Sequence, residues 1–178
     1  MRRSVRLAFG DCRGTAAVEM ALVLPLLLAL MYGSVELGNY FMNQHSLVKA
    51  VRDGARFAAR QNFTNYPDCS TVNTTVRDNT RNVVMYGYLS GTAKLTPNIS
   101  ASDITLTVSC AAAAGGQNML GIYRSRFGAT CNGAAAGGCA QIVQVSAAVT
   151  YRPVLEALGF TGRGYRLYAS SQAAVAGI

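Results

Sequence analysis

The hydrophobic pattern begins with an apolar run and then changes to a mixed helical pattern. Residues 15–33 carry one charge, Glu19, and a run of this length suffices to cross a bilayer, which needs about 20 residues. Apolar positions then recur at helical intervals up to Arg60; they are Val35, Leu37, Phe41, Leu47, Val48, Val51, Ala55, Phe57 and Ala58. We therefore predict one helix of about 45 residues, roughly 70 Å long. Pro25 lies inside it and predicts a kink or local loosening.

A break and a second helix follow. The segment 62–68, with Pro67, reads as a turn, and the next segment, from Ser70 to about Leu89, shows valines at helix-like intervals. Asp68 or Ser70 is the candidate N-cap. Residues 87–102 are predicted to form a loop, because Gly91 and Pro97 punctuate them.

In three segments, apolar and polar residues alternate with a period of two, which is typical of strands with one buried face. Their apolar positions are Ile104, Leu106 and Val108; Val143, Val145, Ala147, Val149 and Tyr151; and Leu167, Ala169, Ala173 and Val175. We predict an α+β fold in which a three-stranded antiparallel sheet is covered on its apolar face by the helices.

The first two strands are separated by residues 111–140, which are rich in Ala and Gly. A structureless loop of this length is uncommon unless it is functional or disordered. Met119, Leu120, Ile122 and Tyr123 either pack back as a short helix or form a binding surface, and we favour packing.

The charge is basic but unevenly placed. The chain has 178 residues and a net charge of +8, which suits one small domain plus the N-terminal segment. No Arg/aromatic module of the RNA-binding kind is present, so nucleic acid is not an expected partner. Four basic residues share one face of the long helix, namely Lys49, Arg52, Arg56 and Arg60. A solvated stripe is favoured over contacts with Glu36 or Asp53 of neighbouring subunits, or with anionic headgroups.

Five cysteines occur, at positions 12, 69, 110, 131 and 139. If Cys12 is cytoplasmic or removed, the other four imply two disulfides in an exported domain, with three possible connectivities. An antiparallel second helix and first strand bring Cys69 and Cys110 to the same end. That arrangement suggests one disulfide between Cys69 and Cys110 and another between Cys131 and Cys139, although Cys139 is also near the end where Cys69 and Cys110 meet.

The chemistry of an enzyme is missing from the sequence. It contains no nucleophile elbow, phosphate-binding loop, zinc-protease motif or dinucleotide fingerprint. There is no CxxC pair, and His45, the only histidine, lies within the long helix. We expect no catalytic residue, no metal and no cofactor.

A basic leader precedes the apolar run. Its four arginines place the start in the cytoplasm and the rest outside; they are Arg2, Arg3, Arg6 and Arg13. A secretory signal peptide is the competing interpretation, but it needs a small-x-small cleavage site after the apolar run. Tyr32-Gly33-Ser34 matches that pattern poorly.

The segment Gly14-Thr15-Ala16-Ala17-Val18-Glu19 resembles the prepilin cleavage site of the type IV pilus superfamily. The longer stretch from Gly14 to about Arg60 closely resembles the N-terminal part of TadE-like proteins, the minor pilins or pseudopilins of tight-adherence (Flp, type IVc) pilus systems. Glu-Met stands where the major Flp pilin usually has Glu-Tyr, and the chain is far longer, so the minor component is favoured. The resemblance implies a pilin-like roll.

The resemblance also implies roles for three residues. A prepilin peptidase would cut after Gly14, where a side chain would obstruct close approach, and leave a new ammonium group at Thr15. Glu19 of a neighbouring subunit would neutralise that ammonium in an apolar bundle. The alternative for Glu19 is an interfacial side chain of a plain signal anchor, reaching the headgroups.

These inferences divide the chain into a leader (1–14), a transmembrane and protruding helix (15–62) and a periplasmic or extracellular α+β domain (63–178). The implied partners are a prepilin peptidase, other minor pilins, the major Flp pilin and the inner-membrane assembly platform. The precursor would cross the inner membrane once and later join the pilus. The rival is an uncleaved bitopic protein whose periplasmic domain binds a ligand or an envelope component. A secreted soluble domain would need a new terminus beyond residue 33.

Overall fold

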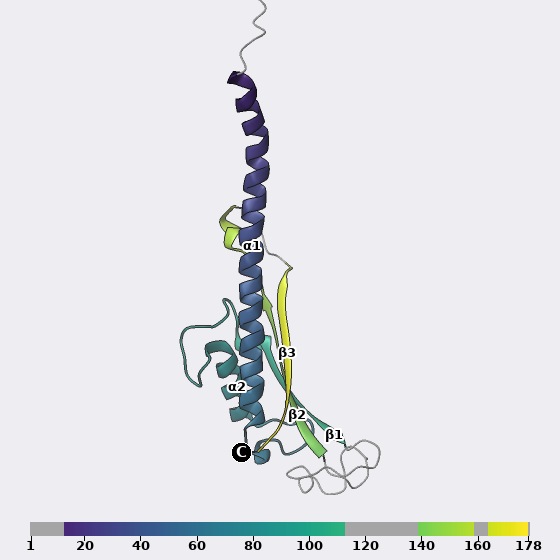
Figure 1. The fold of residues 1–178 in the computed structure, drawn as a ribbon. Helices are drawn as coiled ribbons and strands as arrows, with labels where there is room; N and C mark the ends of the chain where they lie inside the picture. The colour runs from purple at the N-terminus through teal and green to yellow at the C-terminus, as the bar shows by residue number, and fades with distance from the viewer. Residues whose placement is uncertain (1–12, 113–138, 159–163, 178) are drawn as a thin grey trace, which may run out of the picture.

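A computed structural model describes residues 13–112, 139–158 and 164–177 of the chain. Two helices and a three-stranded sheet form the fold (Figure 1). In chain order the elements are α1 (Arg13–Ala59), η1 (Phe63–Asn65), α2 (Thr74–Tyr86), η2 (Ala101–Asp103), β1 (Ile104–Ala112), β2 (Cys139–Thr150), η4 (Val154–Leu158) and β3 (Arg166–Ala174). The predicted α+β class is confirmed.

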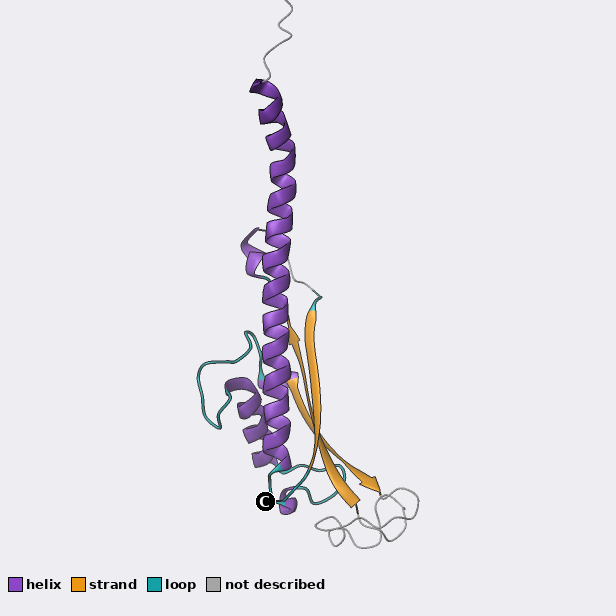
Figure 2. Cartoon of the chain, in the orientation of Figure 1, coloured by secondary structure: helices purple, strands orange, loops and turns teal. Residues whose placement is uncertain are grey.

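Helix α1 is a single long α-helix of 47 residues. Its N-terminal half extends beyond every other described element, and its C-terminal half packs on the sheet and on α2 (Figure 1). The backbone stays helical across Pro25 (Figure 2). A local bend at this proline remains a prediction.

The sheet is antiparallel with the order β1-β2-β3. Its register pairs Val108 with Val143 and Val149 with Leu167, so the alternating apolar positions fall on one face. The ladder continues to the pair of Ala112 and Cys139. The ends of the expected 111–140 loop therefore belong to β1 and β2, because the backbone pairing of the two strands extends to these residues. Its central residues, including Met119, Leu120, Ile122 and Tyr123, lie outside the described part of the chain.

The core lies between this apolar face and the two helices. Its members include Leu47, Val51, Ala55 and Ala58 of α1, Val76 and Val84 of α2, and Ile104, Val143, Val145, Val149 and Leu167 of the sheet. Tyr66 is also fully buried, and its hydroxyl donates a hydrogen bond to the carbonyl oxygen of Ala58 at 2.6 Å.

Helix α2 is shorter than the sequence suggested. It begins at Thr74 because Asn73 is its N-cap, accepting a hydrogen bond from the Thr75 N–H. It ends at Gly87, which has a φ of 78° and so adopts the left-handed conformation that glycine tolerates best. The expectation of a cap at Asp68 or Ser70 is wrong: the Asp68 carboxylate closes the preceding turn instead.

Candidate membrane and assembly site

The N-terminal half of α1 exposes its apolar side chains. No side chain between residues 14 and 46 is fully buried. The exposed large ones include Val18, Met20, Leu22, Leu24, Leu26, Leu27, Leu30 and Met31. A helix that is apolar on all sides belongs in a membrane or in a bundle. By length and composition, α1 is the one helix in the described residues that qualifies as a membrane span.

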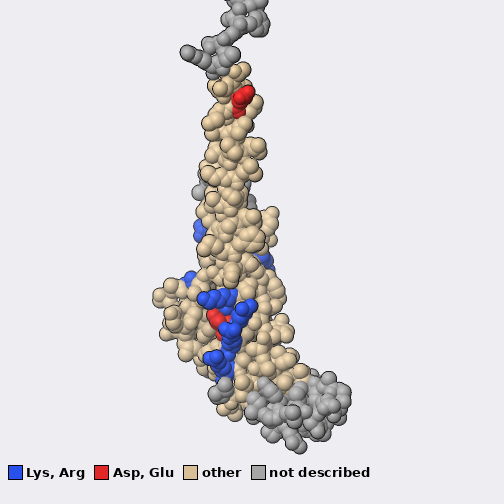
Figure 3. Space-filling model, in the orientation of Figure 1, with Lys and Arg blue, Asp and Glu red and all other residues tan. Residues whose placement is uncertain are grey.

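The residues singled out at this end lie on the first turns of α1. Gly14 and Thr15 are in the first turn and Glu19 follows Thr15 by four residues, so these two share a face. Figure 3 shows one acidic side chain near this end on an otherwise uncharged surface. A Cβ added at Gly14 would meet none of the described residues within 4 Å. The packing of the described residues therefore sets no requirement for glycine at this position.

A polar clamp lies where α1 leaves the apolar run. We use this name for Glu36 and Asn39 of α1 together with Tyr151 and Leu155. The Tyr151 hydroxyl donates to Glu36 Oε1 and accepts from Asn39 Nδ2 at 2.8 Å. The Leu155 N–H donates to Glu36 Oε2 at 3.2 Å. The clamp thus ties the segment after β2 to the helix.

Aromatic packing and burial support this clamp. The rings of Tyr40 and Tyr151 meet edge to face with centroids 5.2 Å apart. Burial raises the pKa of Tyr151, and the hydrogen bond to the Glu36 carboxylate raises it further. Sequence reasoning missed the clamp. It considered Glu36 as an acid for a neighbouring subunit, whereas the structure engages Glu36 within its own chain.

The basic row of α1 lies beyond the clamp. Lys49, Arg52, Arg56 and Arg60 are all exposed, and Figure 3 shows the blue stripe they form on the sheet-bearing half of α1. Asp53, the other acid considered for a neighbouring subunit, lies within 3.8 Å of Arg56 in the same chain. Exposed pairs of this kind contribute little stability, so the row is described best as a solvated stripe.

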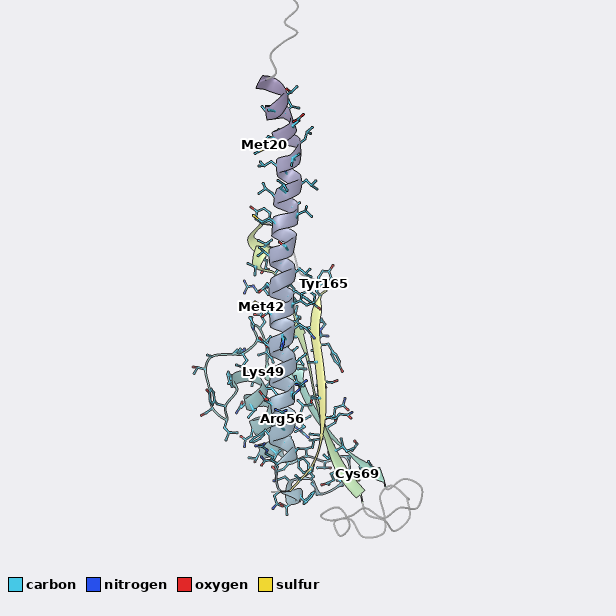
Figure 4. The ribbon with its side chains drawn as sticks, viewed as in Figure 1. Met20, Met42, Lys49, Arg56, Cys69 and Tyr165 are labelled. Atoms are coloured by element: carbon cyan, nitrogen blue, oxygen red, sulfur yellow. A yellow bond between two sulfur atoms is a disulfide. The ribbon has the colours of Figure 1, made fainter. Side chains whose placement is uncertain are left out.

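The expected apolar face of α1 is divided in two. Leu47, Val51, Ala55 and Ala58 are buried against the sheet and α2, whereas Val35, Leu37, Phe41 and Val48 are exposed. Met42 is exposed as well, and Figure 4 shows it between the apolar end and Lys49. The apolar surface of the first half therefore continues past residue 33.

A disulfide joins two segments at the end of the molecule opposite the apolar run. Cys69 and Cys110 form a disulfide with their Cα atoms 5.2 Å apart, and Figure 4 shows Cys69 far from the apolar end. Cys12 and Cys131 lie outside the described residues, so the 131–139 pairing remains a prediction. Beside the disulfide, hydrogen bonds from the Ser70 N–H and from Thr71 and the Ser70 side chain lower the pKa of Asp68 to about 2.

The described residues hold no group of three His, Cys, Asp or Glu side chains that suits a metal ion. His45 lies exposed on α1, where the apolar and basic positions surround it. Among the described residues, His45 belongs to no group of three His, Cys, Asp or Glu side chains.

Comparison with known proteins gives one match. Residues 14–56 match the family model described as TadE-like protein. No curated protein and no solved structure matches the chain. The matched range starts at Gly14 and covers the apolar run, the α1 side of the clamp and most of the basic row. The family match associates this segment with Tad pilus machinery, and the family is structural rather than enzymatic. Residues 14–56 of this chain are therefore a TadE-like segment.

Proposed function

We propose that this protein is a minor pilin, or pseudopilin, of a type IVc tight-adherence pilus. In this proposal a prepilin peptidase cuts the precursor after Gly14, and the product acts in pilus assembly, priming, or tip formation and adhesion. The observation that carries the proposal is the exposed apolar run of α1, residues 15–33, in which Glu19 is the only charge and follows Thr15 by four residues.

The proposal gives Glu19 a physical role. A carboxylate within a membrane span costs several kcal/mol unless it finds a partner. Cleavage after Gly14 would create an ammonium group at Thr15, at the same level of the apolar bundle. Pairing between the Glu19 of one subunit and the Thr15 ammonium of the next would then favour one register between neighbouring helices.

The rest of α1 suits lengthwise packing among subunits. Leu37, Phe41 and Met42 extend the apolar surface beyond residue 33, whereas the core of the outer domain starts at Leu47. Other minor pilins and the major Flp pilin would cover this surface, and the inner-membrane assembly platform would receive the precursor. The protein would cross the inner membrane once, with its C-terminal domain in the periplasm, before it enters the pilus.

Replacement of the Glu19 carboxylate tests this proposal. We expect Glu19→Gln to remain in the membrane at the wild-type level but to be lost from sheared filaments, because the neutral amide cannot pair with an ammonium. Glu19→Asp keeps the charge and should retain part of the incorporation. Glu156→Gln, at an exposed acid of η4, is the matched control. Wild-type incorporation of Glu19→Gln would refute the proposed role.

The rival is an uncleaved bitopic membrane protein whose periplasmic domain binds a ligand or an envelope component. It predicts that neither the wild type nor any Glu19 variant is found in sheared filaments. It also predicts that the leader remains on the chain. Peptide mapping of the filament and membrane fractions distinguishes the two accounts.

A further inference from the structure

The helical turn η4, which follows β2, lies toward the apolar end of α1. Figure 1 shows η4 beside α1, past the end of the sheet and nearer to the N-terminus than β3. The hydrogen bond from the Leu155 N–H to Glu36 Oε2 fixes this level. Glu36 follows Gly33, the last residue of the apolar run, by three positions, which is about 5 Å along a helix axis.

The position of η4 is held by the clamp. Tyr151 contacts Glu36, Asn39 and Tyr40 just before η4 begins, and the Tyr151 N–H donates to the Tyr165 carbonyl oxygen at 3.0 Å across the connection. Tyr151 is therefore joined both to the helix that would span the bilayer and to Tyr165, at the other end of the connection. A membrane around residues 15–33 would have its outer surface at the level of η4.

The exposed side chains at this level suit a lipid headgroup region. Val154 of η4 is 57% exposed, and Tyr165, at the end of β3 that faces the apolar half of α1 (Figure 4), is 67% exposed. Tyrosine is enriched at membrane–water interfaces because its ring is apolar and its hydroxyl is polar. The charges nearby, Arg152 and Glu156, form an exposed ion pair at 2.9 Å.

We propose that η4 and Tyr165, the described parts of the β2–β3 connection, rest on the outer surface of the same membrane that α1 crosses, with Val154 and Tyr165 in the headgroup layer. The occupant of this surface is lipid, because the exposed residues continue the apolar surface of α1 and the clamp holds them at its edge. The inference rests on the proposed membrane placement of residues 15–33. It adds a second contact, which would fix the height and tilt of the outer domain.

The absence of tryptophan from the chain permits a background-free test. Single-tryptophan variants of the full chain are placed in vesicles of phosphatidylethanolamine and phosphatidylglycerol whose acyl chains carry bromine near the headgroup. Met20→Trp reports on the apolar half of α1, Val154→Trp and Tyr165→Trp report on the connection, and Tyr88→Trp is an exposed control after α2.

We expect the emission of Val154→Trp and Tyr165→Trp to be strongly quenched by brominated lipid and that of Tyr88→Trp to be unchanged. If Met20→Trp is quenched but neither reporter of the connection is, the membrane placement stands and the inference is wrong. A blue shift at position 154 without lipid quenching also overturns it, because the side chain is then buried in protein. Loss of quenching at Met20 refutes the membrane placement itself. Tyr165→Trp replaces one exposed aromatic ring by another, so it provides a reading even if Val154→Trp misfolds.

Discussion

Gly54 and Gly38 lie on the same helix but have different surroundings. A Cβ at Gly54 would lie 2.4 Å from Val84 Cγ2 of α2, whereas a Cβ at Gly38 would meet nothing within 4 Å. At the residue scale, glycine is thus required at Gly54, where α1 and α2 approach closely. The fold does not require it at Gly38, farther along α1.

Substitution of these two glycines by alanine should have opposite effects on stability. Gly54→Ala should lower the free energy of unfolding by about 1–3 kcal/mol, because the stiff valine cannot move away without disturbing the core. Gly38→Ala should be neutral or raise it by up to about 1 kcal/mol, since alanine favours an exposed helix. Denaturant unfolding in detergent micelles measures both values. Equal destabilisation by the two variants would contradict the described contact between α1 and α2.

The raised pKa of the buried Tyr66 predicts a loss of folding stability at high pH. Burial raises the pKa of Tyr66 above its usual value, so the folded chain keeps a proton that the unfolded chain releases near pH 10. Stability that is fully present below that pH is therefore lost as the pH rises through it. Tyr66→Phe should make the free energy of unfolding less dependent on pH between about pH 9 and pH 11.

At neutral pH the same variant should lose about 1 kcal/mol with the hydrogen bond to the Ala58 carbonyl. Tyr88→Phe, at an exposed ring, is the control and should follow the wild type throughout. A Tyr66→Phe curve parallel to that of the wild type would show that Tyr66 does not determine the alkaline limb.

At the scale of elements, one short segment is tied to the end of the sheet. Gln141 of β2 lies opposite Cys110 of β1. Its buried amide donates to the Tyr66 carbonyl oxygen at 2.7 Å and to that of Asp68 at 3.4 Å. The disulfide from Cys69 to Cys110 completes this attachment, so the turn before α2 cannot move without the sheet.

Removal of the disulfide should cost much of the stability of the outer domain. The two cysteines are separated by 41 residues, and closing a loop of that length in the unfolded chain is worth about 4 kcal/mol in the chain-entropy model. The variant Cys69→Ala with Cys110→Ala should show this loss in denaturant unfolding, whereas Cys12→Ser in the leader should not. An unchanged free energy of unfolding in the double variant would contradict the stabilising role.

The elements differ in how well the sequence predicts them. Period-two alternation located the three strands, because every inward position of β2 from Val143 to Val149 is buried. The start of α2 was wrong because two nearby side chains compete as caps, and Asn73 rather than Asp68 binds the helix N-terminus. The clamp left no local signal, since Glu36 and Tyr151 are 115 positions apart and meet only once the sheet is packed on α1.

At the scale of the whole molecule, apolar and polar surfaces are separated along α1. The apolar run with its single charge at Glu19, the clamp and the basic row follow one another from residue 14 to residue 60 (Figure 3). The matched TadE-like range, residues 14–56, covers most of this part of α1. The domain that α2 and the sheet form with α1 therefore lies at one end of this long helix, and the other end has an apolar surface suited to lipid or to neighbouring helices.

Gly14 should matter for processing and not for folding. Because none of the described residues lies within 4 Å of a Cβ at this position, Gly14→Leu should leave the unfolding of the domain that α1, α2 and the sheet form unchanged. The larger side chain should obstruct a peptidase that needs close backbone approach, so the leader should remain attached. Immunoblots of the membrane fraction for the longer chain check this, with Gly33→Ala as the control. Normal shortening of Gly14→Leu would argue against cleavage at this glycine.

The mass of the intact mature protein, isolated from its own cells, examines the main proposal most directly. Processing as proposed yields a chain that begins at Thr15, with the arginine-bearing leader gone and the ammonium four residues before Glu19. A mature chain that still begins at Met1 would contradict it.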